Sequence, residues 1–179
     1  MINDEGLAIV KKYEGLVDGD PDTPGLDPYL DPINIATIGW GSCWSFNGSR
    51  ITMDHRSITI DEAEHLLRRY CLRAERSIGR LVKVPLTSNQ RSALISFVYN
   101  VGSGNFQRSS ARMKLNRFDY EGAANEFWKW RRAGGRILRG LVARRKSEAR
   151  LFRTVSQKAS PPLGHPLTEV FTPSGQKAR

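Results

Sequence analysis

Histidine and cysteine are scarce in this chain of 179 residues, which has three and two of them. No zinc-type spacing connects His55, His65 or His165 with Cys43 or Cys71, so we expect no structural metal and no cofactor. Two cysteines are too few for a disulfide scaffold. The composition favours two free thiols and leaves a single bridge open.

Long apolar runs are also missing. No stretch approaches the roughly 18 apolar residues that a membrane-spanning helix needs. Residues 1–5 lack the basic and then apolar order of a signal peptide. We therefore expect a soluble protein that is made in the cytosol, with no signal peptide and no transmembrane segment.

Acidic residues are few compared with basic ones: Asp and Glu number 18, Lys and Arg 28, and the formal net charge is +10. This excess predicts attraction to a polyanion, which could be nucleic acid, a membrane surface or an acidic wall polymer. A simpler explanation is that the positive charge only keeps the protein soluble. Composition alone does not distinguish solubility from binding to any of these polyanions. Several basic residues gather in the last predicted helix, namely Arg144, Arg145, Lys146, Arg150 and Arg153.

The N-terminal third predicts one short helix followed by loops and a hairpin. Apolar spacing over residues 4–14 is helical, with Asn3 as its N-cap and Gly15 at its C-terminal end. Residues 18–28 are rich in Pro, Gly and Asp and form a loop. The β-favouring segment over 29–41 then indicates a small hairpin or short meander.

The remainder of the chain is helical in pattern. Thr59 with Glu62 and Thr87 with Gln90 form two capping boxes, each before an apolar helix. A glycine pair at 134–135 breaks the later helical patterns, which cover residues 108–116, 120–132 and 141–153.

These elements predict an α+β fold that is mainly α, with one domain over residues 1–154. Residues 15–58 form a small α/β lobe, and residues 59–154 form a helical lobe on which the first helix packs. Trp128 and Trp130 are expected in the core of the helical lobe. The cleft between the lobes is the natural site, and residues 155–179 form an irregular, proline-containing tail.

Three residues suggest catalytic chemistry. Glu14 shares a helical face with apolar residues, and a poorly solvated carboxyl favours the protonated form that a general acid needs. Asp31 and Thr37 flank a turn, where a carboxylate activates a water and a hydroxyl holds it. Each has a simpler explanation: an exposed helix end for Glu14, an Asp-Pro turn for Asp31, and strand propensity for Thr37.

The order of the short motifs is more specific than any of these residues alone. Tyr13-Glu14-Gly15, Tyr29-Leu30-Asp31 and Thr37-Ile38-Gly39-Trp40-Gly41 follow one another. This order resembles the active-site segment of the phage-type lysozymes, the family that includes the T4 and lambdoid phage endolysins. The resemblance covers about residues 4–153 and includes Gln90-Arg91-Ser92-Ala93-Leu94, Ser96-Phe97-Val98-Tyr99-Asn100-Val101-Gly102, and Gly140-Leu141-Val142-Ala143-Arg144-Arg145-Lys146-Ser147-Glu148.

The resemblance implies a lysozyme-like fold and hydrolysis of the β-1,4 bond between N-acetylmuramic acid and N-acetylglucosamine in bacterial peptidoglycan, causing host lysis. It implies that Glu14 is the proton donor, that Asp31 activates or positions water, and that Thr37 orients that water. Three further matching positions either line the sugar cleft or serve helix packing, and the sequence does not decide between these roles: Tyr99, Asn100 and Ser109.

Three departures from the family accompany the resemblance. Glu14 and Asp31 are farther apart along the chain, which residues 17–27 accommodate as a surface loop. Ser42 stands where the family often has a histidine. Many relatives carry an N-terminal membrane anchor, which we do not expect in this chain. We therefore expect a monomer that is made in the host cytoplasm and acts in the periplasm or wall after a holin opens the membrane. Weak contact with anionic membrane surfaces is a further possibility.

Alternative functions remain at this point. A nucleic-acid-binding module explains the positive charge, but the sequence has no recognition motif or aromatic platform among its basic residues. An inactive lysozyme fold could bind the wall or serve as a virion structural protein. A lytic transglycosylase cuts the same bond without a water-directing carboxylate, so Asp31 argues against it.

Overall fold

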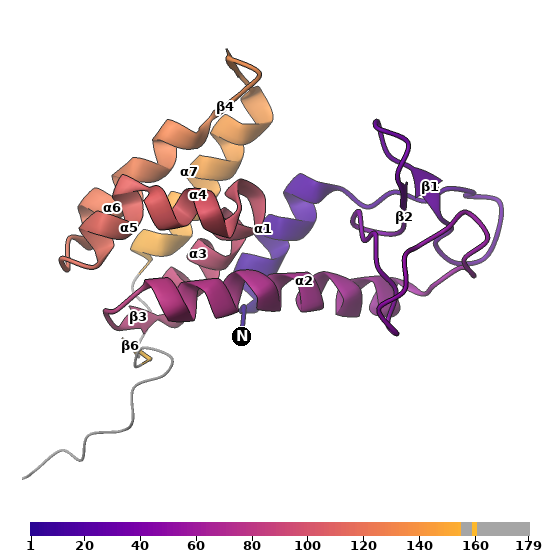
Figure 1. Ribbon diagram of the computed structural model, residues 1–179, viewed down its shortest axis with the longest axis horizontal. Helices are drawn as coiled ribbons and strands as arrows, with labels where there is room; N and C mark the ends of the chain where they lie inside the picture. Colours follow the sequence, from indigo (N-terminus) through magenta and orange to yellow (C-terminus); the bar gives the residue numbers. More distant parts are fainter. Residues whose placement is uncertain (155–158, 161–179) are drawn as a thin grey trace, which may run out of the picture.

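The computed structural model of the protein describes residues 1–154 and 159–160. A small lobe of loops and short strands and a larger helical lobe are joined by one long helix, α2 (Ile60–Leu81) (Figure 1). This is the mainly helical α+β architecture that the sequence predicts. The predicted tail lies outside the described residues, except for strand β6 (Ala159–Ser160).

Helix α1 (Asp4–Glu14) begins and ends where the sequence predicts. Asn3 Oδ1 accepts a hydrogen bond of 3.0 Å from the backbone N–H of Gly6, which satisfies a free donor of the first turn. Gly15 ends the helix with a φ of 75°, a conformation that strains residues with a Cβ. The helix packs on the helical lobe, and its C-terminal end leads into the small lobe (Figure 1).

The small lobe contains little regular structure. Strand β1 (Tyr29–Leu30) pairs antiparallel with β2 (Ala36–Thr37), which is the short hairpin predicted from the sequence. Asn34 in the connecting turn has a φ of 60°, which asparagine tolerates better than most residues. Isolated bridges, such as that between Leu26 and Ile58, hold the surrounding loops. Turns and single backbone pairs therefore define this lobe more than strands do.

The predicted capping box begins helix α2. Thr59 Oγ1 accepts a hydrogen bond from the Glu62 backbone N–H at 3.1 Å, and Glu62 Oε2 accepts one from the Thr59 N–H at 2.8 Å. Buried residues recur along one face of the helix, among them Leu67 and Ile78. As a single continuous helix, α2 connects the two lobes directly (Figure 1).

Helix α3 (Ser88–Val101) is the centre of the helical lobe. It begins with the second predicted capping box, formed by Thr87 and Gln90. Residues 91–98 are all buried, so neighbouring elements cover this helix on every side. Phe97 stacks on Phe127 with ring centroids 4.4 Å apart and an interplanar angle of 14°.

The helices within residues 103–132 are shorter than the sequence predicts, whereas the last one, predicted over 141–153, is observed over Arg139–Arg153. The pattern over 108–116 is divided at Ser109, whose hydroxyl accepts a hydrogen bond of 3.2 Å from the Arg112 N–H and caps a new helix. The pattern over 120–132 ends in a 3-10 turn. The observed elements are α4 (Ser103–Arg108), α5 (Ser110–Leu115), α6 (Tyr120–Glu126), η1 (Phe127–Trp130) and α7 (Arg139–Arg153).

Two short ladders complete the described part of the helical lobe. The glycine pair at 134–135 forms the turn between β4 (Arg132–Ala133) and β5 (Arg136–Ile137), so the break predicted there is correct. Strand β3 (Leu86–Thr87) pairs antiparallel with β6.

The prediction that both tryptophans of η1 pack in the core is wrong for Trp128. This residue is 43% exposed, and the Arg131 guanidinium lies 4.5 Å from its ring centroid. Trp130 is half-buried and meets Phe97 edge-on at 6.0 Å. Side chains two residues apart on a helix point in different directions, so only one of the two faces the core.

Both cysteines are free thiols: Cys71 is buried and Cys43 is half-buried. Burial raises the pKa of the Cys71 thiol to about 12. Within residues 1–154 and 159–160, no group of three or more His, Cys, Asp or Glu side chains could hold a metal ion.

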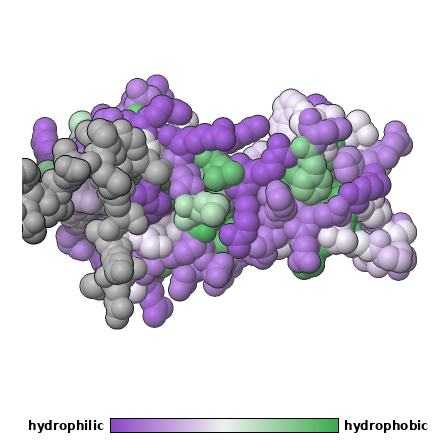
Figure 2. Space-filling view, turned by 90° about the horizontal axis from the view of Figure 1, so that it is seen from below, coloured by the Kyte–Doolittle hydropathy of each residue, from purple (hydrophilic) through white to green (hydrophobic). Residues whose placement is uncertain are grey.

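The described surface is mostly polar. Seen from below in Figure 2, hydrophilic residues cover most of the molecule, with small hydrophobic patches between them. Of the helices that the structure describes, none combines the length and apolar character needed to cross a bilayer.

Thr59→Ala is expected to lower the free energy of unfolding by about 1 kcal/mol, because it leaves a backbone donor of α2 without its cap. Urea unfolding followed by circular dichroism measures the change. Thr52→Ala is the matched control at an exposed loop threonine, and it should change stability by less than about 0.5 kcal/mol. Equal effects would contradict a capping role.

Candidate active site

The end of α1 and the end of the β1–β2 hairpin meet in the small lobe. The backbone N–H of Val17 donates to the carbonyl of Gly39 at 3.2 Å. Val17 lies three residues after Glu14, and Gly39 lies two residues after Thr37. This bridge brings the segment that follows Glu14 to the hairpin that carries Asp31 and Thr37.

Glu14 forms an ion pair with a buried arginine. Arg144 Nη1, from α7, donates to Glu14 Oε1 at 2.6 Å; the arginine side chain is 3% exposed and the glutamate side chain 25%. A carboxylate at this end of a helix meets the negative end of the helix dipole, and the guanidinium offsets that repulsion. Arg144 also lies 5.9 Å and 6.0 Å from the ring centroids of Tyr13 and Tyr99. Glu14 therefore contacts a charged group, Arg144, in addition to the apolar helical face that the sequence predicts for it.

Arg144 is itself held in place by a buried network. Glu148 Oε1 accepts hydrogen bonds from Arg144 Nε at 3.2 Å and from Ser96 Oγ at 2.7 Å. Glu148 is fully buried and also pairs with Arg145, whose Nε lies 2.8 Å from Glu148 Oε2. Buried charges are stable only when they are paired and hydrogen-bonded. The network thus fixes Arg144 and, through it, the carboxyl of Glu14.

Asp31 and Thr37 lie in one hairpin, as the sequence predicts. Asp31 Oδ1 accepts hydrogen bonds from the backbone N–H groups of Ile33 at 2.9 Å and Ile35 at 2.8 Å. Asp31 Oδ2 accepts no hydrogen bond from the described residues. Thr37 is 3% exposed, and its hydroxyl donates to the Tyr29 carbonyl at 3.4 Å.

Tyr99 and Asn100 lie in the last turn of α3. Burial raises the pKa of Tyr99, and the negative charge of Glu14 adds to the rise, so the phenol lies within electrostatic reach of that carboxyl. Asn100 is exposed, and its Oδ1 accepts a hydrogen bond from Arg145 Nη2 at 3.0 Å. Both side chains are therefore linked to the charged groups around Glu14.

Ser109 has a structural role as the N-cap of α5. It is 6% exposed, and its hydroxyl donates to the Phe106 carbonyl at 2.7 Å while it accepts the Arg112 N–H. A hydroxyl with both bonds inside a helix cap has little capacity left for a sugar. The helix-packing alternative therefore describes Ser109 better than the sugar-binding one.

Tyr70 on α2, which the sequence analysis did not single out as a site residue, connects the candidate groups. The Cys43 backbone N–H donates to Tyr70 Oη at 3.1 Å. Burial raises the pKa of Cys43, and the charge of Asp31 adds to it, so Asp31 lies within electrostatic reach of this segment. Tyr70 likewise contributes to the raised pKa of Tyr99. The tyrosine lies between the surroundings of Asp31 and those of Glu14.

Arg144 is the second residue whose role the sequence did not indicate. It was one of several basic residues in the last predicted helix, and its partner Glu14 lies 130 positions away in the chain. The four-residue spacing from Arg144 to Glu148 is the one local signal, because such a pair lies on one helical face.

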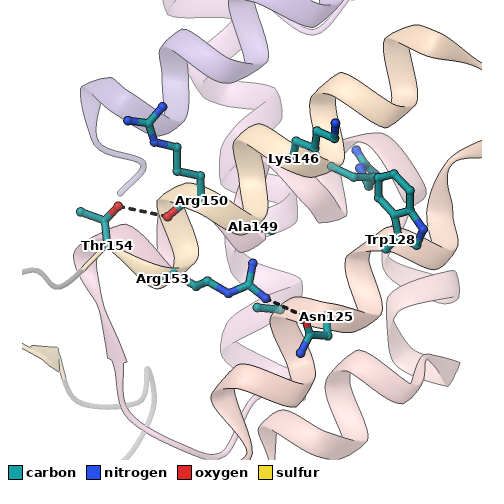
Figure 3. Close-up of a pocket in the computed structure, with 9 residues that line it drawn as sticks. Asn125, Trp128, Lys146, Ala149, Arg150, Arg153 and Thr154 are labelled. Atoms are coloured by element: carbon teal, nitrogen blue, oxygen red, sulfur yellow. Dashed lines mark hydrogen bonds between the residues drawn. The ribbon is translucent and has the colours of Figure 1, made fainter.

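A large cavity of about 700 Å³ lies elsewhere, between α7 and the α6–η1 segment (Figure 3). Lys146, Arg150 and Arg153 come from α7, and Asn125 and Trp128 come from the other wall. Its lining contains no carboxylate and none of the predicted site residues. Glycoside hydrolysis needs a carboxylic acid at the scissile bond, so this cavity is not the candidate reaction site.

Comparisons with known proteins agree with the sequence resemblance. The sequence model of the phage lysozyme family matches residues 12–148. An endolysin of Acyrthosiphon pisum secondary endosymbiont phage 1 is 36% identical over 157 residues, covering 86% of this chain and 98% of the relative. The endolysin of Salmonella phage P22 is 32% identical over 151 residues, covering 84% of this chain and 97% of the relative.

Solved structures of similar fold also include a phage lysozyme and a muramidase domain. A variant of P22 lysozyme superposes with a TM-score of 0.74 at 31% identity and covers 86% of this chain and 99% of the P22 chain. The muramidase domain of SpmX from Asticaccaulis excentricus has a TM-score of 0.69 at 29% identity, covering 87% of this chain and 99% of that domain.

Glu148→Gln is expected to destabilise the protein by about 3–5 kcal/mol, because it leaves Arg144 and Arg145 buried without a compensating charge. Guanidinium chloride unfolding measures the loss. The control Glu121→Gln removes an exposed partner of Arg153 and should destabilise the protein far less, because solvent screens an exposed ion pair. A loss at position 148 no larger than that at 121 would show that the network does not stabilise the fold.

Proposed function

The chain belongs to the phage lysozyme family and is a glycoside hydrolase of the endolysin type, and from this premise we propose that its reaction depends on Glu14, Asp31 and Thr37. The substrate class is bacterial peptidoglycan, and the bond cleaved is the β-1,4 linkage from N-acetylmuramic acid to N-acetylglucosamine. The observation that carries the assignment is the Glu14–Arg144 ion pair at the end of α1, next to the bridge that joins this segment to the hairpin.

Glu14 is the proposed proton donor. In its protonated form it gives a proton to the glycosidic oxygen as the bond to the sugar breaks. The carboxylate that remains then lies 2.6 Å from Arg144 Nη1. A fixed cation at this position stabilises the charge that develops on Glu14 during the transfer.

Asp31 is the proposed base. Its Oδ1 closes the hairpin turn, and its Oδ2 takes a proton from the attacking water or holds that water in position. Thr37 lies opposite Tyr29 in the same hairpin, and its hydroxyl orients the water. Because the turn fixes Asp31, the base is preorganised on the small lobe while the acid belongs to α1.

Tyr99 and Asn100 are the proposed sugar contacts. An aromatic ring and an exposed amide suit a glycan, since sugar rings stack on aromatic faces and their hydroxyls need hydrogen-bond partners. Residues 1–154 form the proposed lysozyme domain, which the family match over residues 12–148 supports.

Two finer points about the biology stay predictions: passage from the host cytoplasm to the wall through a holin, and action as a monomer. Some relatives, such as that of Bacteriophage PS119, are named SAR-endolysins. Expression in bacteria with and without a co-expressed holin tests the first point, and sedimentation of the purified protein tests the second.

Glu14→Gln is expected to reduce wall clearing by about 10²- to 10⁴-fold, the usual contribution of a general acid. The measurement is turbidity loss of outer-membrane-stripped Gram-negative walls. Asp22→Asn, at an exposed loop carboxylate, is the control and should clear walls like the wild type. Clearing by a folded Glu14→Gln variant at the control rate would mean that another group is the acid.

Asp31→Asn is expected to abolish clearing while the melting temperature stays close to that of the wild type. Asparagine keeps the side-chain oxygen that accepts the two turn hydrogen bonds, but it cannot take a proton from water. Thermal unfolding and the turbidity assay separate these effects. A large drop in melting temperature together with normal specific activity would reverse the assignment.

The products of the wild-type enzyme distinguish hydrolysis from lytic transglycosylation. Hydrolysis leaves a reducing N-acetylmuramic acid end, whereas a transglycosylase leaves a 1,6-anhydro end. The presence of Asp31 predicts reducing ends, and mass spectrometry of released fragments identifies them. A majority of anhydro ends would remove the water-activating role from Asp31.

A further inference from the structure

The cavity between α7 and the α6–η1 segment, which the proposed reaction does not use, has a positively charged lining (Figure 3). Its volume of about 700 Å³ lies within the usual range of small-molecule sites, about 300–1,000 Å³. The described residues of its lining include four cationic side chains and no carboxylate. We name it the α7 cavity, defined by Asn125, Trp128, Arg145, Lys146, Arg150 and Arg153.

Three of the cations follow one face of α7. Lys146, Arg150 and Arg153 are spaced by four and three residues, so they are neighbours on the helix surface and repel one another. Neither Lys146 nor Arg150 has a carboxylate partner within residues 1–154 and 159–160. The helix dipole favours the two arginines near the last turn, but it does not account for Lys146. An anion in the cavity offsets the repulsion among all three.

Arg145 adds a buried charge to the same wall. Its side chain is fully buried, and its Nη1 has no hydrogen-bond partner among the described residues. Its carboxylate partner, Glu148, is shared with Arg144. Burial lowers the pKa of Arg145, so the fold compensates its charge only in part. Since Arg145 lines the α7 cavity, an anion there supplies further compensation.

Trp128 gives the opposite wall an exposed aromatic ring. The side chain is 43% exposed, and the Arg131 guanidinium lies 4.5 Å from its ring centroid. The face of an aromatic ring is partly negative, so it attracts the partly positive C–H groups of a sugar. The position of Trp128 in the cavity lining therefore suits a carbohydrate ring.

Arg153 is the cation that the protein already holds in place. Its Nη2 donates to Asn125 Oδ1 at 2.7 Å, the bond drawn in Figure 3, and its Nε donates to Glu121 at 2.8 Å. Arg153 therefore joins the two walls of the cavity. Lys146 and Arg150, which are exposed, are left as the cations that a ligand can pair with.

We propose that the α7 cavity binds a phosphorylated sugar of the kind found in anionic wall polymers, with the phosphate between Lys146 and Arg150 and the sugar ring against Trp128. A phosphate ester carries more negative charge than a carboxylate and has three acceptor oxygens, so it can pair with both cations at once. The neighbouring aromatic ring favours a sugar phosphate over inorganic phosphate.

This site is separate from the candidate active site. Arg144 contacts Glu14 from one side of α7, and residues two and six positions further along a helix point away from that side. Lys146, Arg150 and Trp128 are not among the proposed catalytic or sugar-binding residues. A ligand in the α7 cavity therefore attaches the protein to the wall at a second place, which leaves the catalytic groups accessible.

Calorimetric titration with N-acetylglucosamine 1-phosphate tests the site. The double variant Lys146→Gln/Arg150→Gln is expected to bind at least about tenfold more weakly than the wild type, because the phosphate loses two charged partners. Trp128→Leu should weaken binding by about three- to tenfold and leave the weaker binding of inorganic phosphate unchanged. All three positions are exposed, and circular dichroism checks that each variant is folded.

The matched control is Arg132→Gln/Arg136→Gln, which removes the same charge from the exposed β4–β5 hairpin and should bind like the wild type. Equal binding by the wild type and the double variant at 146 and 150 would overturn the proposal. Equal losses in both double variants would also overturn it and would indicate general charge attraction. Inorganic phosphate that binds the wild type as tightly as the sugar phosphate would remove the sugar from the assignment.

Sedimentation with Gram-positive walls in the cold tests the source of the ligand. Hydrofluoric acid cleaves phosphodiester-linked polymers from such walls and leaves the glycan, so it should reduce retention of the wild type to the level of Lys146→Gln/Arg150→Gln. Unchanged retention would overturn the assignment to a wall polymer. Phosphatidylglycerol vesicles should bind the wild type and this variant alike, and a loss confined to vesicle binding would favour a lipid surface over the proposal.

The site and the proposed function can fail independently. Neither the titration nor the sedimentation requires cleavage of a glycosidic bond. A folded wild type that clears no walls but binds the sugar phosphate through Lys146 and Arg150 would contradict the proposed function and support the site. A wild type that clears walls, with the sugar phosphate bound equally by the variant, would do the reverse.

Discussion

The arrangement of this molecule depends on a buried charge network in which Glu148 compensates both Arg144 and Arg145. Charges as deeply buried as these are costly alone, so the fold is tied to the geometry that pairs them. The network joins α7 to α3 through Ser96 and continues through Arg144 to Glu14 on α1. Three helices that are distant in sequence are thus fixed relative to one another by the same interaction that orients the acid candidate.

Local sequence signals predicted the parts of the fold that local physics controls. The caps at Asn3, Thr59 and Thr87 use donors and acceptors within a few residues, and the structure has all three. The sequence did not predict that Ser109 separates α4 from α5. A serine inside a helical pattern is assigned to the helix unless its cap geometry is known. Arg144 could not be assigned to Glu14 either, since no local pattern reports a contact across 130 residues.

The candidate site also combines residues that the sequence predicts with contacts that only the tertiary structure shows. The order of motifs placed Glu14, Asp31 and Thr37 together, and the Val17–Gly39 bridge is the contact that brings their segments to one place. The arginines of α2 were visible in the sequence as charge alone. Their partners are a property of the tertiary structure: Arg68 pairs with Asp4 of α1, and Arg69 donates to the carbonyls of Ser45 and Phe46.

The double use of Asp31 has a consequence for how this sequence can evolve. One oxygen of its carboxyl closes the hairpin turn by accepting two backbone hydrogen bonds, and the other accepts none from the described residues and is the one proposed to act on water. Asparagine would preserve the turn and lose the charge, whereas glutamate would keep the charge and displace the turn contacts by one methylene. Under the role proposed for Asp31, aspartate alone satisfies both demands, so selection for folding and selection for wall lysis would retain the same residue.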